Sequence, residues 1–336
     1  MNFPKPRPII QLFFLILTIW IIYRYYEFVF TGTPRPDAID AFCPIVGVFD
    51  ILMKIKTGIT DPYHPAAMAF ILTSIITTLL IGKVFCSYIC IVGTITDFLV
   101  TTRKKFLPLN FFSRTGKKLK NWRFYPLLDF TLRTPKFLIL GWFIHTMMSF
   151  PSQAMIMMAQ TSNASADISL FKWWIELLKG GHPVATVIIA VLFTLSILIP
   201  RFWCRYLCPL GALYGIFNLF SITRIRRKEN SCNQCKTCDV CPMGLSPFNM
   251  KEFNNTECMA CLDCQKNCST NSIKTTILGR EISSLVHAGL VVIVFFGIIE
   301  IFKIYGVWHT YMTRETEAFL IFKSGLSPEW IKSLLH

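Results

Sequence analysis

The chain has 336 residues, of which 53% are hydrophobic, and its mean hydropathy is +0.49. This composition argues against an ordinary soluble enzyme, because runs of about 20 apolar residues are long enough to cross a bilayer as helices. Five such runs occur, at about 9–30, 66–88, 137–158, 184–202 and 284–304. No small-x-small cleavage site follows the first run, so we expect this span to be retained and not removed as a signal.

The net charge of +15 is distributed unevenly along the chain. Residues 101–136 contain ten Lys and Arg against one acid, whereas 31–65 contain three and 159–182 only two. This bias is typical of a cytoplasmic loop that contacts anionic lipid, and it favours membrane lipid over nucleic acid as the partner. We therefore predict a multi-pass protein of a prokaryotic cytoplasmic (inner) membrane. Its N-terminus and its Cys-rich segment would be cytoplasmic, and its C-terminal tail periplasmic or external.

Eight of the thirteen cysteines form two tandem runs that match the bacterial ferredoxin pattern. In that pattern each run supplies three thiolates to one cubane and the fourth to its neighbour. We predict two [4Fe–4S] clusters bound by Cys232, Cys235, Cys238, Cys241, Cys258, Cys261, Cys264 and Cys268. Only two residues separate Cys238 from Cys241, where three are usual. The spacing therefore does not decide whether Cys241 binds the second cluster. The alternative is structural zinc, which four cysteines can also hold.

An internal repeat relates two parts of the apolar region at an offset of 118 residues. His64-Pro65 stands 22 residues before Cys86, and His182-Pro183 stands 22 residues before Cys204. Each copy, at about 46–100 and 168–218, predicts an interfacial helix and then a span that ends in Cys-x3-Cys. Repeated membrane units commonly pack about a pseudo-two-fold axis, with the functional site between them.

The repeat contains two Cys-x3-Cys pairs and two of the candidate histidines. A spacing of i, i+4 places both thiols of a pair on one helix face. Cys86, Cys90, Cys204 and Cys208 therefore form a candidate further iron–sulfur centre, and buried structural cysteines are the alternative. His64, His182 and also His145, inside the third span, are candidates for binding a quinone or haem, with helix capping or structural hydrogen bonding as the alternative.

Three other features have weaker interpretations. Cys43 precedes a proline, and we interpret it as a buried or free thiol. His287, near the inner end of the fifth span, fits a structural histidine as well as a functional one. Arg24 and Glu27 are expected to form an interfacial pair.

These observations predict an α-helical integral membrane protein of about five transmembrane helices with an internal two-fold repeat. A small cytoplasmic α+β ferredoxin domain of the bacterial 2×[4Fe–4S] type would be joined to it. The predicted domains are a membrane domain at 1–228, the ferredoxin domain at 229–281, a final transmembrane helix at 282–304 and an outer amphipathic tail at 305–336.

The same motifs resemble those of the NapH/NosR/CcoG-type membrane polyferredoxins, over roughly residues 5–280. The matching pieces, besides the ferredoxin tandem, are Arg7-x3-Gln11, Phe42-Cys43-Pro44-Ile45-Val46-Gly47, His64-Pro65, the segment from Gly82 to Cys90 and the segment from Phe202 to Ala212. The family usually has proline where this chain has Ile91, so the resemblance does not predict the conformation of the turn after Cys90.

The resemblance implies a quinol dehydrogenase-like electron-transfer subunit that exchanges electrons between the quinone pool and a redox partner. The partner would be a ferredoxin-type protein, a flavoprotein or a cytochrome. The alternative that it implies is a CcoG-like factor that reduces copper or another metal during assembly of a respiratory enzyme. The direction of electron transfer is not predicted, because reduction potentials depend on hydrogen bonds and solvent exposure.

Overall fold

A computed structural model describes residues 6–36, 39, 44–106, 125–163, 165–326, 328 and 330. Cys43 and most of the basic loop lie outside these residues. The chain divides into two compact units. Unit 1 comprises Met1–Leu15, Ile75–Trp142 and Ile189–Val294, and unit 2 comprises Ile16–Ser74, Phe143–Ile188 and Phe295–His336.

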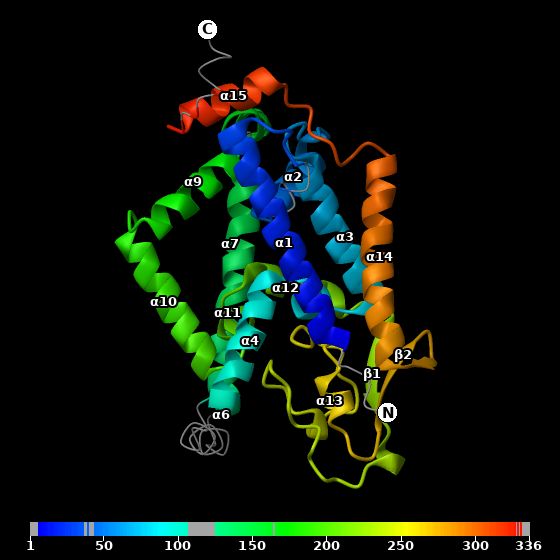
Figure 1. Cartoon of the computed structure of the whole chain (residues 1–336). Coiled ribbons are helices and arrows are strands. Elements are labelled where there is room, and N and C mark those ends of the chain that lie inside the picture. The colour runs from blue at the N-terminus through cyan, green and yellow to red at the C-terminus, as the bar shows by residue number, and fades with distance from the viewer. Residues whose placement is uncertain are drawn as a thin grey trace. The chain divides into compact units, whose positions relative to one another are not determined.

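Five helices contribute residues to both units. They are α1 (Pro6–Thr31), α3 (Pro65–Ile81), α7 (Pro135–Ser149), α10 (Pro183–Leu198) and α14 (Ser284–Ile304). They coincide with the five predicted spans (Figure 1). Two of them, α1 and α14, are long and apolar enough to cross a membrane by themselves.

The other three spans are interrupted near their ends, which leaves helices of 17, 15 and 16 residues. Gly82, with a φ of 98°, ends α3, and Arg201 takes a φ of 55° beyond α10. Pro151 separates α7 from the next helix. The helix Ala166–Leu178 and α10 are bent by 84° relative to each other. If this pair counts as one broken span, the described residues contain up to three spans that could cross a membrane. A total of five transmembrane helices stays a prediction.

Unit 1 contains the whole Cys-rich segment. Its other elements are short and are the π-helix Phe85–Ile89, α4 (Ile91–Phe106), α6 (Tyr125–Arg133), α11 (Phe202–Tyr206), α12 (Pro209–Asn218), the 3₁₀ turns Glu229–Ser231 and Pro247–Asn249, and α13 (Asp263–Lys266). A three-stranded antiparallel sheet frames the Cys-rich runs, in the order β1 (Thr223–Arg227), β2 (Ile273–Ile277) and β3 (Arg280–Ile282). Figure 1 shows this sheet close to α13.

Strand β1 lies before the first cysteine run and β2 after the second. Thr223 pairs with Ile277 and Arg227 with Ile273, so the two strands close the segment that contains all eight ferredoxin cysteines. Leu278 and Gly279 both have positive φ and connect β2 to β3 in a tight hairpin. The sheet therefore begins at residue 223, within the range 1–228 that we assigned to the membrane domain.

Among the described residues of unit 2, one hydrophobic cluster lies around Tyr25 and Phe28 and another around Phe49 and Met155. Its remaining elements are α2 (Pro44–Thr57), α8 (Ser152–Met158), the π-helix Ala159–Asn163, α9 (Ala166–Leu178) and α15 (Arg314–Lys323). The amphipathic stretches expected in the two repeats fall in α2 and α9. The C-terminal tail packs into the unit, because Ile321 is fully buried and Trp330 Nε1 donates to the carbonyl of Val29 at 3.0 Å.

Candidate iron–sulfur sites

The two ferredoxin runs repeat the same backbone conformation. Gln234 and Lys236 have φ values of 56° and 59°, and Ala260 and Leu262, at equivalent positions of the second run, have 49° and 61°. A left-handed residue other than glycine costs about 1 kcal/mol. Such strain persists only where the surroundings impose it, and here it turns each loop around a central point. Both runs therefore have the backbone form of a loop that encloses a bound group.

Four cysteines from both runs surround one pocket, which we call the proximal site. Its cysteines are Cys241, Cys258, Cys261 and Cys264, and its other lining is mostly apolar, from β1 and the adjoining loops. Cys241 thus crosses to the second run in spite of its short spacer. Burial raises the pKa of Cys258 to about 11 and that of Cys261 well above its usual value. These thiols would lose their protons on binding iron.

The remaining four cysteines, Cys232, Cys235, Cys238 and Cys268, form what we call the distal site. Cys238 interacts electrostatically with both Cys268 and Cys232. Cys235 is exposed, and its Sγ lies 3.1 Å from Oγ of Ser269, the residue after Cys268. Burial raises the pKa of Cys268, but hydrogen bonds from Ser272 and Thr270 outweigh it and bring this pKa to about 7. The distal site is therefore the more polar and solvent-accessible of the two.

The donor set fits a cubane better than a single ion. Within the described part of the chain, no three His, Cys, Asp or Glu side chains converge as ligands of one metal ion. A tetrahedral zinc site needs its four sulfurs about 2.3 Å from one atom. In a [4Fe–4S] cluster each thiolate binds a different iron, so the thiolates stand farther apart. Each of the two sites offers four cysteines, which fits the all-thiolate ligation of a cubane.

The Cys-x3-Cys pairs do not lie on continuous helices, so the prediction that each pair shares one helix face was wrong. Cys86 lies in the π-helix, and Cys90 ends it in an extended conformation with a φ of −64° and a ψ of 124°. Cys208 is the N-cap of α12, with a φ of −71° and a ψ of 110°. Proline disfavours a helical residue before it, which explains the break at Cys208-Pro209. Cys90 adopts nearly the same conformation before Ile91, so the turn does not depend on proline.

The structure brings these four thiols together in what we call the membrane cysteine site. Cys204 interacts electrostatically with Cys86, Cys90 and Cys208. Gly93 and Gly211 each stand three residues after the second cysteine of a pair. A Cβ would lie 2.6 Å from the carbonyl oxygen of Cys86 at Gly93, and 3.4 Å from that of Cys204 at Gly211. A side chain at Gly93 would therefore crowd the cysteine loop, whereas one at Gly211 would make an ordinary contact.

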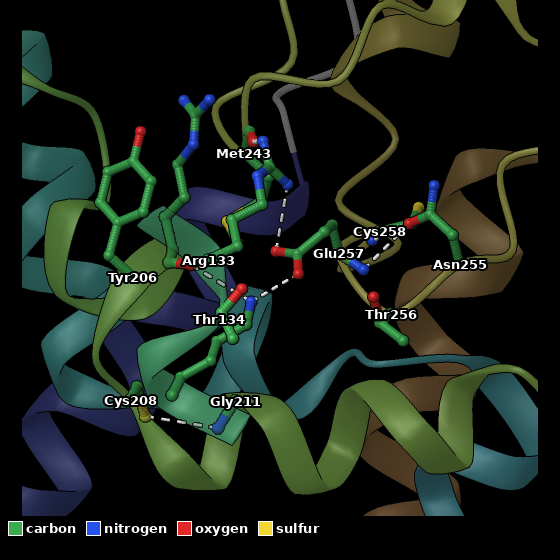
Figure 2. Close-up of polar contacts among 12 residues, drawn as sticks. Arg133, Thr134, Tyr206, Cys208, Gly211, Met243, Asn255, Thr256, Glu257 and Cys258 are labelled. Atoms are coloured by element: carbon green, nitrogen blue, oxygen red, sulfur yellow. Dashed lines mark hydrogen bonds and ion pairs between the residues drawn. The ribbon is translucent and has the colours of Figure 1, made fainter. Parts of the chain in front are cut away.

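The backbone N–H of Gly211 points at a thiol. It donates to Cys208 Sγ at 3.3 Å, as Figure 2 shows. Hydrogen bonds from backbone N–H groups to thiolate sulfurs are among the features that set the potential of an iron–sulfur cluster. This contact, together with the four converging thiols, fits a further cluster better than buried structural cysteines.

The membrane cysteine site and the proximal site are neighbours. Cys86 packs against the buried cluster of Met243, Met259 and Cys261, which Cys241 also contacts. At Gly215 of α12 a Cβ would lie only 2.5 Å from the carbonyl oxygen of Thr256, so helix and loop are in close contact. All three cysteine sites thus belong to unit 1.

Buried ion pairs support these sites, and most of their residues were not singled out from the sequence. Arg201 is fully buried and binds Asp97 through Nε at 2.9 Å and Nη2 at 2.6 Å. Its Nη1 donates to the carbonyl oxygen of Cys86 at 2.6 Å. Arg7 bonds to Asp97 and, at 2.6 Å, to Asp263 in the second ferredoxin run. The sequence feature that could have identified these residues is the position of a charged residue at the border of an apolar span.

A second set of ion pairs holds the loop before Cys258. Glu257 is buried and lies 2.5 Å from Lys136 Nζ and 3.3 Å from Arg133 Nη1. The side chain of Asn255 accepts hydrogen bonds from the backbone N–H of Glu257 and of Cys258. Figure 2 shows this turn, with Glu257 directed toward Arg133. Since Lys136 and Arg133 come from α7 and α6, the ferredoxin loop is bonded to helices of the apolar region.

The candidate histidines have different surroundings. In unit 2, His64 is fully buried, with Nδ1 3.8 Å from an oxygen of Asp61 and Nε2 3.7 Å from an oxygen of Asp167. Asp167 accepts hydrogen bonds from the hydroxyl of Tyr25 at 2.7 Å and from Arg35 at 3.0 Å. Buried acids around a buried histidine form a site that can hold a proton. These acidic partners of His64 were not predicted from the sequence.

His182, the repeat equivalent of His64, is about a third exposed. Its Nε2 lies 3.1 Å from Oε2 of Glu176, and its ring stacks on Trp173 with centroids 5.8 Å apart. His145 is exposed. In unit 1, His287 is buried beside the ring of Tyr88. The repeat therefore places one histidine among buried acids and the other at the surface of unit 2.

Comparison with known proteins places iron–sulfur sequence in both copies of the repeat. A family model described as a 4Fe-4S binding domain matches residues 63–110 and 182–228. The first segment contains Cys86 and Cys90, and the second Cys204 and Cys208. Both copies match one iron–sulfur model.

Two relatives cover much of the chain. "Putative electron transport protein YccM" of Escherichia coli strain K12 is 30% identical over 260 residues, which are 76% of this chain and 61% of YccM. The chain thus spans about three fifths of that relative. "Uncharacterized protein MJ0750" of Methanocaldococcus jannaschii is 23% identical over 206 residues, 61% of this chain and 77% of the relative. No solved structure matches the chain.

Proposed function

We propose that this chain is a membrane protein that relays electrons between the quinone pool and a redox partner through three iron–sulfur clusters. One observation carries the proposal: twelve cysteines from two repeats and two ferredoxin runs gather into three four-cysteine sites within one compact unit. The 4Fe-4S domain match and the printed name of the relative YccM support it. Bound clusters would supply one-electron chemistry, and the protein would supply position and electrostatics.

The contacts between sites suggest their order in the relay. Cys86 of the membrane cysteine site packs against a buried cluster that contains Cys261 of the proximal site. Cys241, which ends the first run, lines the proximal site and joins it to the distal site along the chain. Cys235 of the distal site is exposed. We propose that the distal site exchanges electrons with the soluble partner, which would be a ferredoxin-type protein, a flavoprotein or a cytochrome.

His64 and its acidic neighbours are the proposed quinol end. Oxidation of a quinol to a quinone releases two electrons and two protons, so a site for it needs proton acceptors as well as clusters. His64, between Asp61 and Asp167, supplies an imidazole whose protonated form two carboxylates would stabilise. Among the described residues, the acidic neighbour of His182 is Glu176, which is itself partly exposed.

The arrangement in the membrane is part of the same proposal. Five spans would place the N-terminus and the ferredoxin runs in the cytoplasm and the C-terminal tail outside, as in the NapH/NosR/CcoG-type polyferredoxins. The charge of residues 101–136 and the two long apolar helices support it.

Metal analysis and quinol reduction test the proposal. We expect anaerobically purified protein to contain about twelve iron atoms with matching sulfide, since each cubane holds about four. A menaquinol analogue should reduce part of them, as monitored by electron paramagnetic resonance. Zinc without iron would refute the cluster assignment. Loaded clusters that dithionite reduces and quinol does not would refute the quinone role alone, and faster oxidation of the reduced clusters by Cu(II) than by quinone would favour a metal reductase.

A further inference from the structure

Lys83 is a buried lysine directly after α3. Its exposed fraction is 1%, and it follows Gly82, whose positive φ ends the helix. Its Nζ donates a hydrogen bond of 3.1 Å to the carbonyl oxygen of Thr256, two residues before Cys258. Its backbone N–H donates to Oδ1 of Asn218 at 3.0 Å. The ammonium group is therefore held inside unit 1, against the loop that leads into the proximal site.

Two of the three cysteine sites face this ammonium group. Lys83 interacts electrostatically with Cys86 and Cys208 of the membrane cysteine site, and also with Cys258 of the proximal site. Asn218, which fixes the backbone of Lys83, donates through Nδ2 to the carbonyl oxygens of Asn255 and Cys258 at 2.8 and 3.2 Å. These hydrogen bonds hold Lys83 against the loop of the proximal site.

Among the described residues of unit 1, Lys83 differs from the other buried cations because no carboxylate is paired with it. Arg7, Lys136, Arg201 and Arg205 are each paired with Asp or Glu. For Lys83 no carboxylate oxygen of the described residues lies within 4.0 Å of Nζ, whose hydrogen-bond partner is a neutral carbonyl. A buried ammonium without a counter-charge is costly. Clusters bound by four thiolates carry net negative charge and would provide it.

We infer that Lys83 is a positioning residue for electron transfer, whose ammonium is a charge shared by the membrane cysteine site and the proximal site. A fixed positive charge in a poorly solvated interior stabilises an added electron on either site. It therefore raises the reduction potential of both centres relative to that of the distal site. Lys83 is not among the main charges that act on Cys235 and Cys238 of the distal site, so we expect the potential of that site to change least. The inference rests on the three clusters of the proposed function.

Redox titration of the full-length protein tests this inference. Detergent-solubilised, anaerobically purified protein is titrated with dithionite and mediators, and cluster reduction is followed by electron paramagnetic resonance. Lys83→Met removes the charge, Lys83→Gln removes it but keeps a donor for Thr256, and Lys83→Arg keeps it. The matched control is Lys179→Met, which removes an exposed lysine at the end of α9 in unit 2.

In both neutral variants, two of the three reduction waves should move to lower potential by at least about 59 mV. For a one-electron centre this shift is a tenfold change in the ratio of reduced to oxidised cluster. The third wave should stay in place, and Lys83→Arg and Lys179→Met should leave all three near their original positions. Movement of all three waves, of one wave only or of none would overturn the inference. Loss of iron from both neutral variants would do so too, since it would make Lys83 a structural residue. Because dithionite is the reductant, failure of the quinone role would not alter these results.

Discussion

At the scale of single residues, Gly244 shows how closely the ferredoxin loop fits against the apolar region. It has a φ of 73°, and a Cβ there would lie 2.2 Å from Nη1 of Arg205. Arg205 has little freedom to move, because it is buried and bound to Asp129. We expect Gly244→Ala to combine backbone strain with a steric clash and to cost about 2–4 kcal/mol of unfolding free energy. Thermal unfolding of the loaded protein, with iron content, measures this.

Gly279 is the matched control for Gly244. Its φ is 83°, but nothing lies within 4 Å of the place where a Cβ would stand. Gly279→Ala should therefore lose only the backbone part, about 1 kcal/mol. Equal losses from the two variants would mean that the contact with Arg205 is unimportant.

At the scale of elements, the two Cys-x3-Cys segments share a turn that one copy makes with proline and the other without. Ile91 is the first residue of α4, a position where proline is tolerated because its N–H has no helical partner. Cys90 is already extended, as a residue before proline must be. We expect Ile91→Pro to change the unfolding free energy by less than about 1 kcal/mol and to leave the iron content unchanged.

Thr96, in the interior of α4, provides the contrast for Ile91. Thr96→Pro removes a helical hydrogen bond and should cost about 3 kcal/mol or more. Chemical denaturation of both variants distinguishes the cases. Loss of iron in Ile91→Pro, with the fold otherwise intact by circular dichroism, would show that the turn after Cys90 requires isoleucine.

At the scale of the whole molecule, the repeat has produced two unequal halves. His64 and His182 occupy equivalent positions in sequence, yet one lies between two buried carboxylates and the other is partly exposed. If His64 accepts a quinol proton, His64→Gln should slow cluster reduction by quinol about 10²-fold or more, the usual contribution of a general base. His182→Gln should slow it only slightly. Stopped-flow reduction by a menaquinol analogue measures both rates.

Dithionite reduction serves as the control for the two histidine variants, because it bypasses the quinol step. It should proceed equally in the original protein, His64→Gln and His182→Gln. Equal quinol rates in the two variants would remove His64 from the proposed quinol site. A rate that falls more in His182→Gln would move the site to the second copy.

Several features of the site followed from the sequence because they depend on local spacing. The cysteine runs predicted two ferredoxin loops, and both adopt the same left-handed turns at equivalent residues. The 118-residue offset predicted two copies of one unit, and a 4Fe-4S domain model matches a segment in each. The spacing within Cys-x3-Cys was misleading, since an i, i+4 pattern predicts a helix face only if the helix continues. In this structure the helix ends before the second cysteine of each pair.

The sequence by itself determined which residues offer sulfur and how each short loop wraps, because ligand spacing and turn conformation depend on neighbouring residues. Only the tertiary structure decided which sulfurs meet. Cys241 joins the second run, the two membrane pairs converge, and Lys83 lies beside cysteines of two sites. It also separated His64 from His182 by giving one buried acids and the other partial exposure. Contacts between segments far apart in the chain depend on packing and charge pairing, which no local pattern encodes.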